Sequence, residues 1–204
     1  MMTVRQIERM WMGRQYQRLF AELWAARPEG GIGLGLESGP TMTAAAALAV
    51  IRLDEWCQSQ VPLAGQLIRT ILSLQEADGS WSDPAITSLC LRALLCGNGQ
   101  GLAIDRGMQY LAHMQKSEGI WPREPLRRMP ADPLISALVL YELGQNDSFR
   151  QRVRWEAALA WFEKNETSLD TQTRRMWERA KCRCLTPHFS RPGGGGTWSP
   201  AYAA

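Results

Sequence analysis

The feature that most constrains the fold of this chain is a short pattern that returns every forty to fifty residues. A proline is followed three positions later by Thr or Ser at Pro40–Thr43, Pro84–Thr87 and Pro133–Ser136, and the prolines are 44 and 49 residues apart. A looser copy without proline, Asp170–Thr173, follows later in the chain. Repeats of this length are typical of stacked helix pairs. The pattern therefore predicts an all-α chain built from helical hairpin repeats.

Each proline is expected to begin a helix, because proline at the first helical position lacks only a backbone donor that would stay unpaired there. Asp83 and Asp132 stand directly before two of the prolines, where a carboxylate can cap the free amides of the helix. The runs after the prolines are apolar on nearly every side, whereas the segments between them are amphipathic. We therefore expect buried inner helices to alternate with amphipathic outer helices.

These patterns predict eight helices in four hairpins, within a repeat domain of residues 1–185 that is followed by a Gly- and Pro-rich tail of residues 186–204. The expected helices are residues 3–26, 40–54, 61–76, 83–96, 104–116, 132–144, 148–165 and 168–184. In the tail, Thr197–Ala201 is similar to Ser80–Ala85, which leaves open either another helix junction or a flexible tail.

A second pattern ends two of the outer helices. Gln75-x3-Gly79-x-Trp81 and Gln115-x3-Gly119-x-Trp121 have the same spacing and begin 40 residues apart. The glycine permits a left-handed turn after the helix, the Gln amide can bond main-chain groups freed there, and the Trp can cover the junction. The six residues are therefore interpreted as a structural motif.

The second copy is preceded by Arg106-Gly107-x-x-Tyr110-Leu111-x-x-x-Gln115, and the whole string resembles the QW repeat of the squalene and hopene cyclases. The first copy is less complete, with Gln66, Leu67 and Thr70 where basic, small and aromatic residues would stand. The resemblance covers roughly residues 30–145 and extends by period to about 185. It implies the αα-toroid superfamily of terpenoid cyclases and protein prenyltransferases, here as a partial (α/α) toroid of about four hairpins.

The acid that the cyclases use is missing from this sequence. Those enzymes resemble one another in an Asp-x-Asp-Asp cluster, which holds one carboxyl protonated so that it can attack an alkene. No two Asp residues of this chain lie within four positions of each other. Asp132 and Asp83 are the candidate isolated acids, and helix capping is the better interpretation of each. Tyr141 and Trp177 are the aromatic residues of the inner helices available to a ligand or cation.

The sequence also contains clusters of residues that could bind a metal ion or an anion. Cys182-x-Cys184-x3-His188 is too tightly spaced for a usual zinc site, so neither metal nor cofactor is predicted. His113 is interpreted as a surface or packed residue. Basic residues that could bind an anion form two groups, for which solvated charge is the alternative interpretation. They are Arg123, Arg127 and Arg128 after the second motif, and Arg174, Arg175, Arg179, Lys181 and Arg183 on the last helix.

Composition excludes several classes of function. A formal charge of +3 is too small to predict a nucleic-acid partner. The longest apolar run, Thr41–Ile51, is too short to cross a bilayer, so no integral membrane segment is expected. Five cysteines, an odd number, and an N-terminus without an apolar leader favour the cytoplasm.

Three functions remain open. The first is a cyclase-like toroid without cyclase activity, which binds a hydrophobic ligand, isoprenoid by resemblance, or acts as an accessory subunit. The second is a protein-interaction scaffold or homo-oligomer that uses the open end of the repeat array. The third is a terpene-cyclase-like enzyme with a displaced acid. A deep apolar cavity between inner helices would favour the first, and a filled centre would favour the second.

Overall fold

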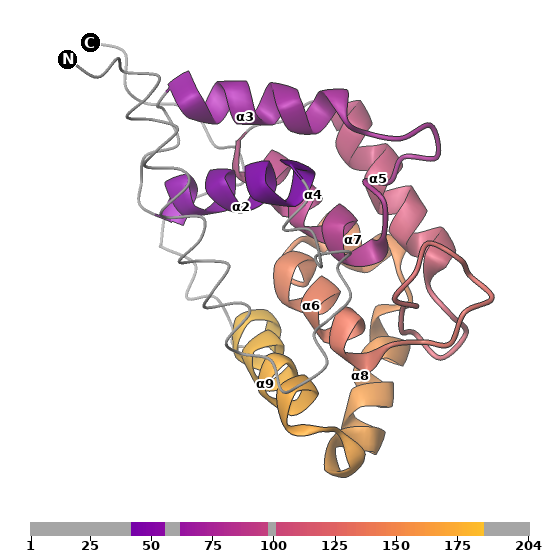
Figure 1. Ribbon diagram of the computed structural model, residues 1–204. Coiled ribbons are helices and arrows are strands. Elements are labelled where there is room, and N and C mark those ends of the chain that lie inside the picture. Colours follow the sequence, from indigo (N-terminus) through magenta and orange to yellow (C-terminus); the bar gives the residue numbers. More distant parts are fainter. Residues whose placement is uncertain (1–41, 56–61, 98–100, 186–204) are drawn as a thin grey trace.

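The computed structural model describes residues 42–55, 62–97 and 101–185 (Figure 1), and within these ranges the chain is helical without β-strands. A single isolated bridge pairs Pro122 with Ala131. The helices are α2 (Met42–Glu55), α3 (Pro62–Ser73), α4 (Pro84–Cys96), α5 (Gly101–Met114), α6 (Pro133–Leu143), α7 (Asp147–Arg152), α8 (Trp155–Asn165) and α9 (Thr171–Leu185), with the 3₁₀ turn η2 (Glu166–Ser168) before α9. The all-α prediction is confirmed. The expected helix 3–26, Pro40 and the tail 186–204 lie outside the described residues.

Four helices, which we call the inner helices, contact one another in chain order. α2 packs on α4, α4 on α6, and α6 on α9. The outer helix α3 contacts α2 and α4, and the outer helix α5 contacts α4. Figure 1 shows this progression from α2 and α3 at the top to α8 and α9 at the bottom. Because α4 has neighbours on several sides, its residues from Pro84 to Leu91 are all buried.

The inner helices α4 and α6 begin where the sequence predicts. Asp83 accepts a hydrogen bond from the Ile86 amide, and Asp132 accepts from the amides of Leu134 and Ile135. Pro84 and Pro133 occupy the first helical turn. Local chemistry therefore fixes these two helix starts, since the cap and the proline lie within a few residues of each other.

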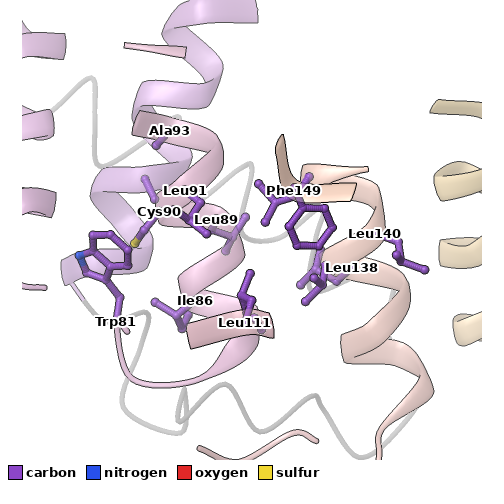
Figure 2. Close-up of a cluster of buried hydrophobic side chains, with 14 of the residues drawn as sticks. Trp81, Ile86, Leu89, Cys90, Leu91, Ala93, Leu111, Leu138, Leu140 and Phe149 are labelled. Atoms are coloured by element: carbon purple, nitrogen blue, oxygen red, sulfur yellow. The ribbon is translucent and has the colours of Figure 1, made fainter. Parts of the chain in front are cut away.

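The core lies between the inner and outer helices. Figure 2 shows Ile86, Leu89 and Leu91 of α4 near Leu111 of α5, with Leu138 and Phe149 beside them. Leu91, Leu94, Leu111 and Leu140 are completely buried. Truncating one such leucine to alanine removes its apolar contacts and leaves a cavity, which costs about 2–5 kcal/mol.

The expected helix 148–165 is wrong, because the chain breaks it into α7 and α8. Val153 is extended, with φ −107° and ψ 165°. The Arg154 amide donates to Oε1 of Gln115 at 2.7 Å, and the Arg154 carbonyl accepts from Nε2 of Gln115 at 3.4 Å. A side chain distant in sequence thus takes both main-chain groups at the break. The segment from residue 166 to 168 also forms η2, so that α9 begins at Thr171 rather than at 168.

The fourth copy of the proline pattern is shifted by one residue relative to the expected alignment. Asp170 caps α9 by accepting from the amides of Gln172 and Thr173. It therefore occupies the position of Asp83 and Asp132 rather than that of the prolines. The Thr173 hydroxyl donates to the carboxylate of Asp170 itself. This copy keeps the helix cap, and its hydroxyl bonds the capping carboxylate, whereas the Thr87 and Ser136 hydroxyls accept from main-chain amides, as described next.

Candidate functional site

The two Gln-x3-Gly-x-Trp copies form nearly the same turn. Gly79 and Gly119 have φ values of +93° and +89°, the region that glycine adopts without strain. The Nε2 of Gln75 donates to the Gly79 carbonyl at 3.0 Å, and that of Gln115 donates to the Gly119 carbonyl at 2.7 Å. The structural interpretation of these glutamines and glycines therefore has a direct physical basis, because each Gln side chain closes the turn that follows its helix.

The tryptophans join the two sequence patterns into one network. The indole N–H of Trp81 donates to the Ile71 carbonyl, and that of Trp121 donates to the Leu111 carbonyl, both at 2.7 Å. The Trp81 amide donates to the Thr87 hydroxyl at 3.0 Å, and the Trp121 amide donates to the Ser136 hydroxyl at 2.8 Å. The hydroxyl of the Thr or Ser in the proline pattern thus accepts a hydrogen bond from the main-chain amide of the Trp in the other pattern. Sequence spacing gives no sign of this link, since six residues separate the first pair and 15 the second.

Each turn also contacts the outer helix of the next repeat. The Gln75 amide donates to the Ala103 carbonyl of α5 at 2.9 Å. A Cβ on Gly79 would lie 2.6 Å from the Arg106 carbonyl oxygen, and one on Gly119 would lie 2.3 Å from the Ala158 nitrogen of α8. The glycines are therefore required for the close approach of successive outer helices as well as for the turn.

The two candidate acids cap different inner helices, Asp83 at the start of α4 and Asp132 at the start of α6. Asp132 also pairs with Arg123, whose Nε lies 2.8 Å from Oδ2. Burial raises the pKa of Asp83 to about 6, against the hydrogen bonds from the Ile86 and Ala85 amides, which lower it. The capping interpretation accounts for both carboxylates.

The candidate ligand-binding residues are not brought together. Trp177 is buried and stacks on Phe162 with ring centroids 4.5 Å apart, so it belongs to the core. Arg127 and Arg128 are exposed on the loop after the second motif. Tyr141 is half-buried on α6, with the Arg183 guanidinium 4.6 Å from its ring centroid. Tyr141 alone among these candidates lines the groove described next.

An open groove of about 570 Å³ lies between Tyr141 and one face of α9. We call it the α9 groove. The described residues that line it are Tyr141, Arg175, Glu178, Arg179, Cys182 and Arg183. The structure divides the basic residues of this helix into two sets. Arg175, Arg179 and Arg183 face the groove, whereas Arg174 donates to the carbonyls of Thr167 and Leu169 and Lys181 pairs with Glu166. Sequence reasoning noted the arginines but missed the groove, because its other wall comes from α6.

The described residues contain no group of three or more His, Cys, Asp or Glu side chains that could hold a metal ion. Cys182 and Cys184 differ in surroundings, since Cys182 is exposed in the groove and the buried Cys184 thiol donates to the Leu140 carbonyl. His188 lies outside the described residues. His113 is exposed on α5, as expected. Among the helices described here, none is long and apolar enough to cross a membrane.

Comparison with protein-family models, with curated proteins and with solved structures finds no match for this chain. A functional conclusion therefore rests on the residues and contacts of the chain itself.

Proposed function

We propose that this chain is a non-catalytic helical-repeat protein of the αα-toroid type that acts as an interaction scaffold. The observation that carries the proposal is that the motif residues form hydrogen bonds or close contacts with the main chain. Gln115, Gly119, Trp121 and their counterparts in the first copy engage main-chain groups at helix ends. Such residues hold a repeat array together, and their polar groups are engaged by the main chain rather than offered to a substrate.

The contacts of the inner helices support the toroid type. In an αα-toroid, inner helices follow one another around a centre and outer helices cover them. The order α2, α4, α6, α9, with α3 and α5 against this series, agrees with that arrangement. The resemblance of residues 106–121 to a QW repeat points to the same class.

The lining of the α9 groove favours a scaffold over a carrier of an isoprenoid. Four of its six described lining residues are arginine or glutamate, and an apolar ligand would remove their charges from water without compensation. The exposed residues of α9 include Arg174, Arg175, Glu178 and Arg179. A protein partner or second copy that contacts this helix would therefore meet charged side chains.

One observation favours the enzyme alternative, namely the raised pKa of Asp83. A pKa of about 6 identifies a carboxyl that is partly protonated near neutral pH. The carboxylate of Asp83 already accepts the Ile86 amide, and no second Asp lies within four positions of it to complete a cluster like that of the cyclases. The capping role of Asp83 is therefore preferred.

Two assays on the purified full chain test this proposal. Lipid extraction followed by mass spectrometry should recover no isoprenoid in stoichiometric amount, and squalene or an isoprenyl diphosphate should be returned unchanged after incubation. A stoichiometric isoprenoid would support the carrier alternative. Cyclised product above the no-enzyme control, lost in Asp83→Asn or Asp132→Asn, would establish the enzyme alternative and overturn the scaffold.

A further inference from the structure

One face of α9 carries a regular row of positive charge. Arg175, Arg179 and Arg183 are each four residues apart and all line the α9 groove. At a rise of 1.5 Å per residue, their backbone positions are separated by about 6 Å. Among the described residues of the lining, Glu178 is the one carboxylate. The groove therefore has an excess of positive charge in a fixed spacing along the helix.

The end of this row is held in place by contacts with α6 and the turn after it. The Arg183 guanidinium lies over the Tyr141 ring, and the Arg183 carbonyl accepts from Nε2 of Gln145 at 2.9 Å. Nη2 of Arg150 donates to the Cys184 carbonyl at 2.8 Å. These bonds hold the last turn of α9 and the Arg183 end of the row in place before a ligand arrives.

We propose that the α9 groove binds an acidic peptide segment of a partner protein, an inference that rests on the scaffold function proposed above. Alternate side chains of an extended peptide are about 6.6 Å apart, close to the spacing of the arginines. Guanidinium groups bind carboxylates with two parallel hydrogen bonds. Glu178 can accept a hydrogen bond from a peptide amide, a donor that a DNA backbone lacks. The groove volume of about 570 Å³ is that of a site for a short segment.

Fluorescence anisotropy of a labelled peptide of alternating Glu and Ser, titrated with the full chain, tests the proposal. The same peptide with Gln in place of Glu, and a single-stranded oligodeoxythymidylate, serve as comparison probes. We expect the Glu peptide to bind and the Gln peptide to bind more than about tenfold more weakly, because the guanidinium–carboxylate bonds are lost. The oligonucleotide should bind more weakly than the Glu peptide.

The matched variants separate this groove from general positive charge. Arg175→Glu/Arg179→Glu should weaken binding of the Glu peptide more than about tenfold. Arg127→Glu/Arg128→Glu, which makes the same change of charge at exposed positions away from α9, should alter it less than about twofold. All four arginines are exposed, so circular dichroism should show unchanged folding. Arg175→Gln/Arg179→Gln provides the same comparison without charge reversal.

Three results would overturn the proposal. They are absence of binding by the Glu peptide, equal weakening by the two charge-reversal variants, and tighter groove-dependent binding of the oligonucleotide. Absence of peptide binding together with clean lipid and cyclisation assays would reject the groove while leaving the scaffold function in place. An isoprenoid or a cyclised product would reject the scaffold function itself.

Discussion

Trp81 and Trp121 each use both of their N–H groups, one from the indole and one from the main chain. The indole N–H reaches a carbonyl ten residues earlier, and the amide reaches a hydroxyl on the following inner helix. Both side chains are almost completely buried. An unpaired N–H there would cost about 1–3 kcal/mol, so the Thr or Ser of the proline pattern has a defined structural role.

At the same scale, Asp83 should give stability a distinctive pH dependence. Burial raises its pKa from 3.8 to about 6 in the folded chain. The folded state therefore keeps a proton on Asp83 in a range where the unfolded chain has lost it. The stabilisation by this group is fully present below about pH 4 and is lost as the pH rises through about 6.

Asp83→Asn should remove this dependence, because Asn caps a helix as well as Asp does and does not titrate. Urea unfolding at a series of pH values measures it. The free energy of unfolding of the wild type should fall more steeply between pH 4 and 6.5 than that of the variant. Parallel curves for the two proteins would show that Asp83 has an ordinary pKa.

At the scale of the helices, the break between α7 and α8 depends on Gln115. Its side chain bonds the Gly119 carbonyl and both main-chain groups of Arg154. The turn after α5 and the start of α8 therefore share one side chain. Phe149 of α7 also stacks on Trp121, with ring centroids 6.2 Å apart, so the short helix covers the junction.

Gln115→Ala should lower the free energy of unfolding by about 1–3 kcal/mol, since buried main-chain groups lose their partners. Gln109→Ala, at an exposed position on the same helix, should change it by less than about 0.5 kcal/mol. Denaturant unfolding of the two variants makes the comparison. A similar effect of both substitutions would mean that the Gln115 side chain does not stabilise the start of α8.

Helix positions could be predicted where their causes are local. Asp83, Pro84, Asp132 and Pro133 act within one turn of the helices that they begin, so their sequence is sufficient. The break at Val153 could not be predicted, because its cause is a side chain 39 residues away. Residues 148–165 alone therefore read as one continuous helix.

The same distinction applies to the sites. The Gln, Gly and Trp roles follow from residue type and turn chemistry and were predicted. The α9 groove was not predicted, since Tyr141 and the arginines of α9 come together only through the packing of α6 on α9. Trp177 was named as a ligand contact because its helix is an inner one, but its face of α9 packs into the core.

At the scale of the whole molecule, the same turn motif connects successive helix pairs at two places in the described chain. The turn after α3 contacts α5, and the turn after α5 contacts α8. Each turn thus joins its own helix pair to the next outer helix. In stacked repeats each helix pair contacts only its neighbours, so the interfaces between neighbours determine how the pairs are arranged. The two turns provide such interfaces.

The central claim is that the repeated motif holds successive helix pairs together. The most direct measurement is the free energy of unfolding of Gly119→Ala compared with Gly101→Ala. At position 119 a Cβ would meet the backbone of Ala157 and Ala158 at a residue with positive φ, whereas at position 101 it would meet nothing within 4 Å. Gly119→Ala should therefore destabilise the chain by about 2–5 kcal/mol. Gly101→Ala should be neutral or stabilise it by up to about 1 kcal/mol. Equal stability of the two variants would contradict the claim.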